Sequence, residues 1–111
     1  MSVTNKTLIA SKQMEAAQTP QYTAPTTARA TIDSFTATNT TASTATISVH
    51  LVISGGTAGV TNLLTDSVEI APNKSYHFPE LIGQTIEAAG FISTIGTASA
   101  ITIRCSGREI T

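Results

Sequence analysis

The chain has 111 residues, enough for one folded domain with a hydrophobic core and too few for two. Charged residues make up only 12% of it, against about 25% in an ordinary soluble domain, and the formal net charge is −1. The six Lys and Arg residues are spread from Lys6 to Arg108, without the clustering that nucleic-acid binding requires. The single cysteine, Cys105, excludes an internal disulfide framework.

A surface so poor in charge favours association, because charge repulsion between molecules is weak. Thr and Ser take the place of the charges and form hydrogen bonds without the desolvation cost of an ion. This composition suits permanent contact with neighbouring subunits, although a merely Thr-rich β-protein is the alternative. No stretch approaches the roughly 20 apolar residues of a membrane span, and the N-terminus has no long apolar leader. We therefore expect synthesis in the cytoplasm and no membrane partner.

Residues 1–26 differ from the rest of the chain. The segment "EAAQTPQYTAPTTA" contains Pro20 and Pro25, which favour extended backbone and block helices and central strands. The segment is too poor in apolar residues to form a core alone. It is either a disordered tail or an extended N-terminal arm that docks on another subunit, and we favour the arm. Its docking residues would be Leu8, Ile9, Met14 and Tyr22.

Residues 27–53 show the two-residue period of β-strands. In "TATISVHLVI" (44–53), apolar residues from Ala45 to Ile53 alternate with mostly polar ones, which predicts a strand with one buried face. Upstream, Ala30 and Ile32 have one phase while Phe35 and Ala37 have the other, so a β-bulge is expected near Asp33 and Ser34. "NTTAST" (39–44) then predicts the turn of an antiparallel hairpin.

The second half of the chain continues with strands and turns. "SGGTAGVTN" (54–62) predicts a flexible loop, and the apolar positions of 64–70 predict a half-buried strand. "PELIGQTIEAAG" (79–90) fits a short helix or a turn. "FISTI" and "AITIRCSGREI" return to strand, with Ile101, Ile103 and Cys105 facing one way. The sequence therefore predicts an all-β domain over 27–111, a single antiparallel β-sandwich that is jelly-roll-like or immunoglobulin-like.

No motif for chemistry stands out. His50 and His77 lie on outward phases of predicted strands without further ligands at metal-binding spacing. Cys105 is in phase with core residues, as a small buried hydrophobe would be. The loop "SGGTAG" lacks the GK[ST] ending of a phosphate-binding loop, and the carboxylates are scattered. We therefore expect no catalytic residue, no metal site, no cofactor and no enzymatic activity.

Charged residues near the C-terminus are candidates for an interface. Arg104, Arg108 and Glu109 lie close together on the predicted final strand. Exposed to water, such charges stabilise a protein by less than about 1 kcal/mol. At an interface they would instead fix the register between subunits. Both interpretations stay open at the level of the sequence.

Three segments resemble a known class of proteins. They are "TARATIDSFTATNTTASTATISVHLV", "IAPNKSYHFPELIGQTIEAAGFIST" and "ITIRCSGREI". Together they are similar to small virion structural proteins of tailed bacteriophages, which decorate heads or form collar and tail parts. The resemblance covers about residues 27–111 and implies a non-enzymatic, multi-copy component of the virion, often a trimer or larger ring.

The leading hypothesis is a capsid decoration or cement protein that assembles with itself and with the major capsid protein or another virion protein. A collar, neck or tail component of the virion is the alternative within this class. A carbohydrate-binding β-sandwich module is an alternative from another class. Sugar binding usually needs exposed aromatic rings, and the chain has no Trp and few other aromatic residues. The expected location is the virion.

Overall fold

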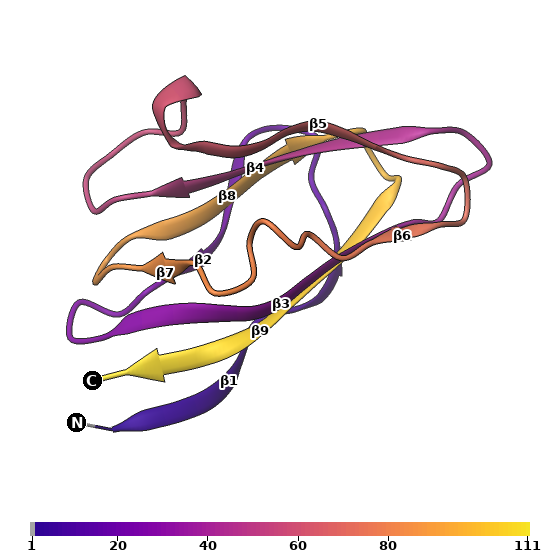
Figure 1. Ribbon diagram of the computed structural model, residues 1–111. Coiled ribbons are helices and arrows are strands. Elements are labelled where there is room, and N and C mark those ends of the chain that lie inside the picture. The colour runs from indigo at the N-terminus through magenta and orange to yellow at the C-terminus, as the bar shows by residue number, and fades with distance from the viewer. Residues whose placement is uncertain (1) are drawn as a thin grey trace.

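The computed structural model describes residues 2–111 as two antiparallel β-sheets packed face to face (Figure 1). Sheet A has the order β1–β9–β3–β6, and β7 also pairs with β3. Sheet B has the order β2–β8–β4–β5. The strands of sheet A are β1 (Val3–Gln13), β9 (Ile101–Ile110), β3 (Arg29–Asn39), β6 (Ser75–Tyr76) and β7 (Thr85–Ile86). Those of sheet B are β2 (Thr19–Thr23), β8 (Phe91–Gly96), β4 (Ala45–Val52) and β5 (Leu63–Ile70).

The strand order is that of a jelly roll. The two-residue strands β6 and β7 pair with opposite ends of β3 and act as two parts of one interrupted strand. Counted in this way, each sheet has four strands, and most consecutive strands alternate between the sheets. This alternation produces the two Greek keys of a jelly roll. The structure confirms the predicted antiparallel sandwich and selects the jelly roll over the immunoglobulin arrangement.

The core lies between the sheets and consists mostly of alanine and isoleucine side chains around two phenylalanines. The β9 residues Ile101, Ile103 and Cys105 face inward and are fully buried, as their phase predicts. Phe35 and Phe78 meet edge to face with ring centroids 4.9 Å apart. Phe78 lies in the segment between β6 and β7, so this segment fills the core where the interrupted strand leaves a gap.

The structure corrects the expected division into an arm of residues 1–26 and a sandwich of residues 27–111. β1 pairs with β9 from Val3 onward, and β2 pairs with β8, so both segments are strands of the sandwich. The proposed docking residues of the arm are buried in the chain's own core, so their side chains cannot contact another subunit. They are Leu8, Ile9, Met14 and Tyr22. The segment is extended as expected, but its hydrogen-bond partners are in the same chain.

Three further expectations can be compared with the structure. The bulge near Asp33 is confirmed by a shift of the β3–β9 register between Ile32 and Ser34. The predicted hairpin at 39–44 is wrong, because β3 and β4 belong to different sheets and the turn crosses the sandwich. Residues 79–90 form turns and the short strand β7. The helical element in the described range is the 3₁₀ turn η1 (Val60–Asn62), and no helix there is long and apolar enough to cross a membrane.

Candidate assembly surfaces

The two outer faces of the sandwich differ in charge. Five of the six Lys and Arg residues lie on sheet A strands, on β1, β3 and β9. The sheet B strands β2, β4 and β8 contain no Asp, Glu, Lys or Arg. The acidic residues of sheet B are Asp66 and Glu69, both on its edge strand β5. The chain therefore folds into a sandwich in which sheet A carries most of the positive charge and sheet B carries charge only on its edge strand β5.

The uncharged face is the outer surface of β2, β8 and β4. Ile95 of β8 is 37% exposed there, and Phe91 on the same strand is half-buried. His50 of β4 also faces outward but is buried, with its Nδ1 atom 3.4 Å from the Gln18 amide. The same amide donates to the Ser93 hydroxyl at 2.7 Å. Neutral hydrogen bonds thus join the Gln18, His50 and Ser93 side chains of this face.

Two shallow grooves mark this face. One, of about 430 Å³, lies between strands β2 and β8 and the β4–β5 loop, and Phe91, Pro20 and Ala58 contribute apolar walls. The other, of about 290 Å³, is lined by residues that include Ser48, Ser67 and Ile95. Neither groove is lined by an Asp, Glu, Lys or Arg side chain. A surface that lacks charge and has shallow grooves with apolar walls is similar to the central part of a protein–protein interface.

The β4–β5 loop, residues 53–62, adds exposed apolar side chains beside this face. Ile53 is 71% exposed and Val60 is 88% exposed. The alternation of 44–53 predicts Ile53 on the buried face of the strand, but β4 ends at Val52, so Ile53 lies in the loop. Because the loop contains three glycines and no charged residue, it can present these side chains to a partner.

On the sheet A strands, Arg108 is paired with a carboxylate within the chain and Arg104 is hydrogen-bonded to hydroxyls. The Arg108 guanidinium forms a bidentate pair with the Asp33 carboxylate, with N–O distances of 3.0 to 3.2 Å. Arg104 donates to the hydroxyls of Ser11 and Thr7 on β1. The sequence left open whether Arg104, Arg108 and Glu109 lie at an interface or are exposed to water. In the structure both arginines are bound to the strands that flank β9.

Glu109 belongs to a different contact, in the seam where the edge strands β1 and β2 face each other. Its carboxylate accepts a hydrogen bond from the Tyr22 hydroxyl at 2.5 Å. The same carboxylate forms an ion pair with the Lys6 ammonium at 3.2 Å. The Tyr22 hydrogen bond and Lys6 together lower the pKa of Glu109. Burial and the same hydrogen bond raise the pKa of Tyr22. This contact joins β2 of sheet B to β9 of sheet A.

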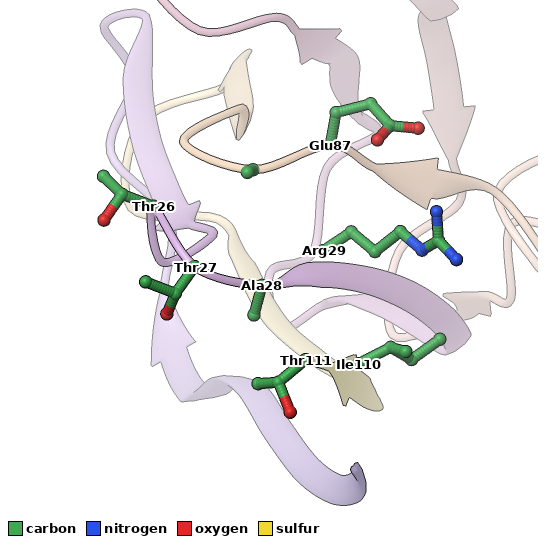
Figure 2. Close-up of a pocket in the computed structure, with 8 residues that line it drawn as sticks. Thr26, Thr27, Ala28, Arg29, Glu87, Ile110 and Thr111 are labelled. Carbon is green, nitrogen blue, oxygen red and sulfur yellow. The ribbon is translucent and has the colours of Figure 1, made fainter. Parts of the chain in front are cut away.

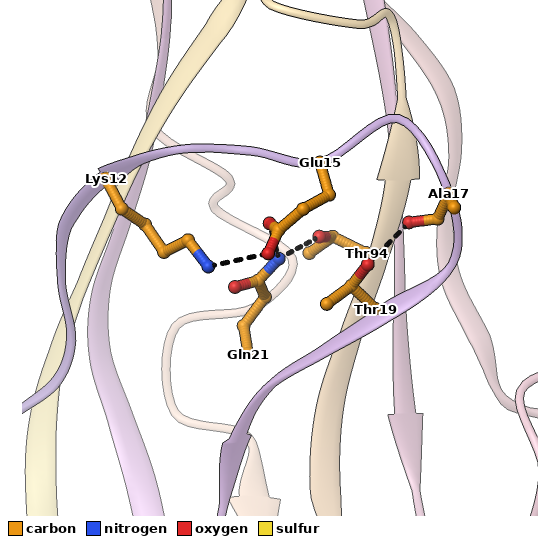
Figure 3. Close-up of polar contacts among 6 residues, drawn as sticks. All are labelled: Lys12, Glu15, Ala17, Thr19, Gln21 and Thr94. Atoms are coloured by element: carbon orange, nitrogen blue, oxygen red, sulfur yellow. Dashed lines mark hydrogen bonds and ion pairs between the residues drawn. The ribbon is translucent and has the colours of Figure 1, made fainter.

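A second polar cluster lies along the same side of the molecule. The Glu15 carboxylate accepts from Gln21 at 3.1 Å and from Lys12 at 3.0 Å (Figure 3). Gln21 also donates to the Thr94 hydroxyl of β8 at 3.0 Å. The hydrogen bonds from Gln21 and Lys12 lower the pKa of Glu15 to about 2. The connection between β1 and β2 is therefore fixed to sheet B.

The opposite seam, between β5 and β6, is closed in a similar way. The Glu80 carboxylate accepts from the Thr65 hydroxyl of β5 at 2.5 Å and from the Tyr76 hydroxyl of β6 at 3.0 Å. Burial opposes ionisation of Glu80, but these hydrogen bonds and a backbone one lower its pKa. Each tyrosine of the chain thus donates to a glutamate, one at each seam. The sequence does not predict the contacts across the seams, because Thr65 and Glu80 are 15 positions apart and Tyr22 and Glu109 are 87 apart.

A third depression, of about 320 Å³, lies at the end of the sandwich where the termini meet (Figure 2). Arg29 of β3 and Glu87 of the β7–β8 turn extend from its walls, beside Ala28, Ile110 and the hydroxyls of Thr26 and Thr27. Arg29 and Glu87 are both exposed. The depression is open, and its ionisable side chains face solvent.

The cysteine and the two histidines lie in different parts of the fold: Cys105 in β9, His50 in β4 and His77 directly after β6. Among residues 2–111, no three His, Cys, Asp or Glu side chains group closely enough to hold a metal ion. Burial raises the pKa of the Cys105 thiol to about 12, so it is a core residue in its neutral form. His77 is exposed, whereas His50 lies under the Gln18 side chain.

Comparisons with known proteins support the fold. No protein-family model and no curated protein matches the chain. Among solved structures, a chain in the structure of infectious bursal disease virus, strain Gx, matches 97% of this chain with a TM-score of 0.51 and 13% sequence identity. This chain spans 31% of the length of that viral chain. At this identity the likeness shows a shared fold.

Proposed function

We propose that the chain is a structural component of a virion, which acts by packing against other virion subunits and has no enzymatic activity. The observation that carries the proposal is the jelly roll itself, whose likeness to a chain of a virus structure extends over 97% of this chain. Jelly rolls of this kind are common in viral capsid proteins and in lectins. The low charge of the sequence supports the same conclusion.

The uncharged face of sheet B is the proposed contact surface. It combines half-exposed apolar side chains with neutral hydrogen-bonding groups, and the apolar β4–β5 loop borders it. The outer face of sheet A carries Asp33, Arg104 and Arg108, whose charged groups are hydrogen-bonded within the chain, so that face is suited to contact with water. Burial of the uncharged face would cost little in desolvation.

Within the virion class, we favour a multi-copy decoration or cement protein on the capsid of a tailed bacteriophage, bound to the major capsid protein and to copies of itself. This finer proposal rests on the sequence resemblance described above. A collar, neck or tail position is the alternative. The protein would be made in the host cytoplasm and carried in the particle.

Copy number in purified particles tests this function. Quantitative mass spectrometry, normalised to the major capsid protein, should find the chain in hundreds of copies if it decorates the head. About a dozen copies would place it at the neck or tail, where symmetry limits the count. Absence from purified particles would overturn the virion proposal.

A carbohydrate-binding module is the second candidate, and the groove beside Phe91 is the observation that favours it. The half-buried Phe91 ring is flanked there by Gln18, Ser93 and Thr57, which can form hydrogen bonds to sugar hydroxyls. Tyr76 is a poorer candidate, because its hydroxyl is bound to Glu80 and its ring packs on Phe78. Binding on a glycan array that disappears with Phe91→Ala, and persists with Thr36→Ala on the other face, would support this function.

A further inference from the structure

β1 has a free edge. It pairs with β9 on one side, and no described strand lies on the other (Figure 1). Ser2 and Thr111 exchange two backbone hydrogen bonds, of 3.2 and 2.9 Å. Because bonded and non-bonded pairs alternate in an antiparallel ladder, the backbone N–H and C=O groups of Val3, Asn5 and Thr7 point away from β9. Such groups are a template for another strand.

The other sheet edges are blunted. β2 has five residues and includes Pro20, which has no N–H group to donate. β5 has two irregularities in its register with β4 and a positive φ of 47° at Ser67. β6 and β7 have two residues each. β1, by contrast, pairs regularly with β9 from Val3 to Thr7 before its first bulge. Among the described edge strands, this part of β1 combines regular pairing over Val3–Thr7 with the absence of proline and of positive φ angles.

The lysines of β1 do not place an unpaired charge at its free edge. A lysine on an edge strand usually discourages pairing with another strand. Here the Lys6 ammonium is bound to both oxygens of Glu109, and the Lys12 ammonium is bound to Glu15. The residues whose backbone groups face the free edge, Val3, Asn5 and Thr7, are exposed and uncharged. Between Val3 and Thr7 the free edge of β1 therefore has no bulge, and the charge of its lysine is paired within the chain.

We propose that β1 pairs antiparallel with β1 of a second copy, with Asn5 opposite Asn5 of that copy on a two-fold axis. This register places Lys6 beside Thr4 of the second copy, and Thr4 is the neighbour of Glu109 in the ladder with β9. Each Lys6 therefore lies diagonal to its own Glu109, and across Thr4 of the second copy it faces the Glu109 of that copy, while the two lysines lie diagonal to each other. The two A sheets become one continuous sheet.

This inference concerns the chain by itself and goes beyond the role in a particle. Its first test is sedimentation equilibrium of the purified full chain over a concentration series, where the mass of two chains is expected at high concentration. Asn5→Pro should shift the chain to the monomer, because the ring removes an edge N–H and blocks the approach of the second strand. The Asn5 N–H does not bond to β9, so the fold should survive. Asn5→Thr is the matched control and should stay dimeric.

Cysteine cross-linking tests the register and does not depend on the proline variant. Asn5→Cys places two cysteines across the axis with Cα atoms about 5.5 Å apart, within reach of a disulfide. Thr7→Cys places them roughly 14 Å apart, which is too far. Mild oxidation should cross-link the first variant and spare the second. A wild-type monomer at every concentration, a dimer unaffected by Asn5→Pro, or equal cross-linking of the two cysteine variants would overturn the proposal.

Discussion

The Tyr22 hydroxyl and the Glu109 carboxylate join the two sheets through a hydrogen bond of 2.5 Å, at the seam between β1 and β2. At the opposite seam, between β5 and β6, Glu80 accepts hydrogen bonds from Thr65 of β5 and from Tyr76 of β6. A β-sandwich is open along its sides, where the inward faces of the edge strands meet water. In this protein a glutamate that also accepts from a tyrosine bridges each opening.

Removal of the Tyr22 hydroxyl should destabilise the fold. We expect Tyr22→Phe to lower the free energy of unfolding by about 1.5 kcal/mol, the lower end for a hydrogen bond to a charged group, because Glu109 keeps its ion pair with Lys6. Urea denaturation of Tyr22→Phe, Glu109→Gln and the double variant measures the coupling of the two side chains. Strictly additive effects of the two substitutions would show that the contact contributes nothing.

Acid should weaken the fold through carboxylates whose pKa is lowered in the native state. The pKa of Glu15 falls from 4.5 to about 2, and that of Glu109 is also lowered. Since the unfolded chain takes up protons at higher pH than the native one, the stabilisation is complete above about pH 5 and is lost as the pH falls toward 2. Denaturation curves at successive pH values should show this decline. Glu15→Gln should flatten it, and an unchanged slope would contradict the assignment.

Phe78 should be among the residues that the fold tolerates losing least. It is fully buried, packs edge to face on Phe35 and Tyr76, and has a positive φ of 42° that the surrounding contacts maintain. We expect Phe78→Ala to cost about 3–5 kcal/mol. Ile82→Ala, four residues later and 52% exposed, is the control and should cost under about 0.5 kcal/mol. Similar losses in the two variants would refute this view of the β6–β7 segment.

Gly107 should resist even a single added methyl group. A Cβ atom there would collide with the carbonyl oxygen of Thr31 on the adjacent strand and with the Leu8 side chain. Because the backbone of a central strand cannot move aside, Gly107→Ala should lower the free energy of unfolding by about 1–3 kcal/mol or more. Gly59→Ala is the matched control, because the nearest atom to a Cβ atom there, the Thr57 carbonyl oxygen, is 4.0 Å away. Thermal unfolding of both variants makes the comparison.

The proposed contact face leads to a prediction about particles. Ile95→Asp introduces a charge on the uncharged face of sheet B, and burial of that charge against a neighbour would be costly. We expect purified particles to contain far fewer copies of this variant. Thr36→Asp on the outer face of sheet A should be incorporated normally, because that face already carries charge. Circular dichroism of both variants verifies the fold, and equal incorporation would remove sheet B as the contact face.

The strands were predictable from the sequence where one face is apolar and the other polar. The phase of Ile101, Ile103 and Cys105 identified the inward side of β9, and the change of phase between Ile32 and Phe35 located the bulge in β3. The sheet to which each strand belongs was not predictable. The turn at 39–44 looks the same whether the chain pairs back on itself or crosses to the other sheet.

The N-terminal strands and the candidate surface were missed for a physical reason. Residues 3–23 contain few apolar side chains, so local composition indicates a free arm, but the available edges of β9 and β8 supply the pairing. The charge asymmetry of the two faces arises only when strands far apart in sequence lie side by side. The one sign of this asymmetry in the sequence is that residues 34–65 contain no Asp, Glu, Lys or Arg.

The uncharged face of sheet B has a kinetic consequence. A surface without charge exerts no long-range attraction, so its encounters with a partner would proceed at the unassisted rate, about 10⁵–10⁶ M⁻¹ s⁻¹. Added salt would change that rate little, since no opposing charges are screened. Apolar burial weakens on cooling, so temperature should control attachment through this face. Subunits joined in this way would stay in place when ionic strength changes and would loosen in the cold.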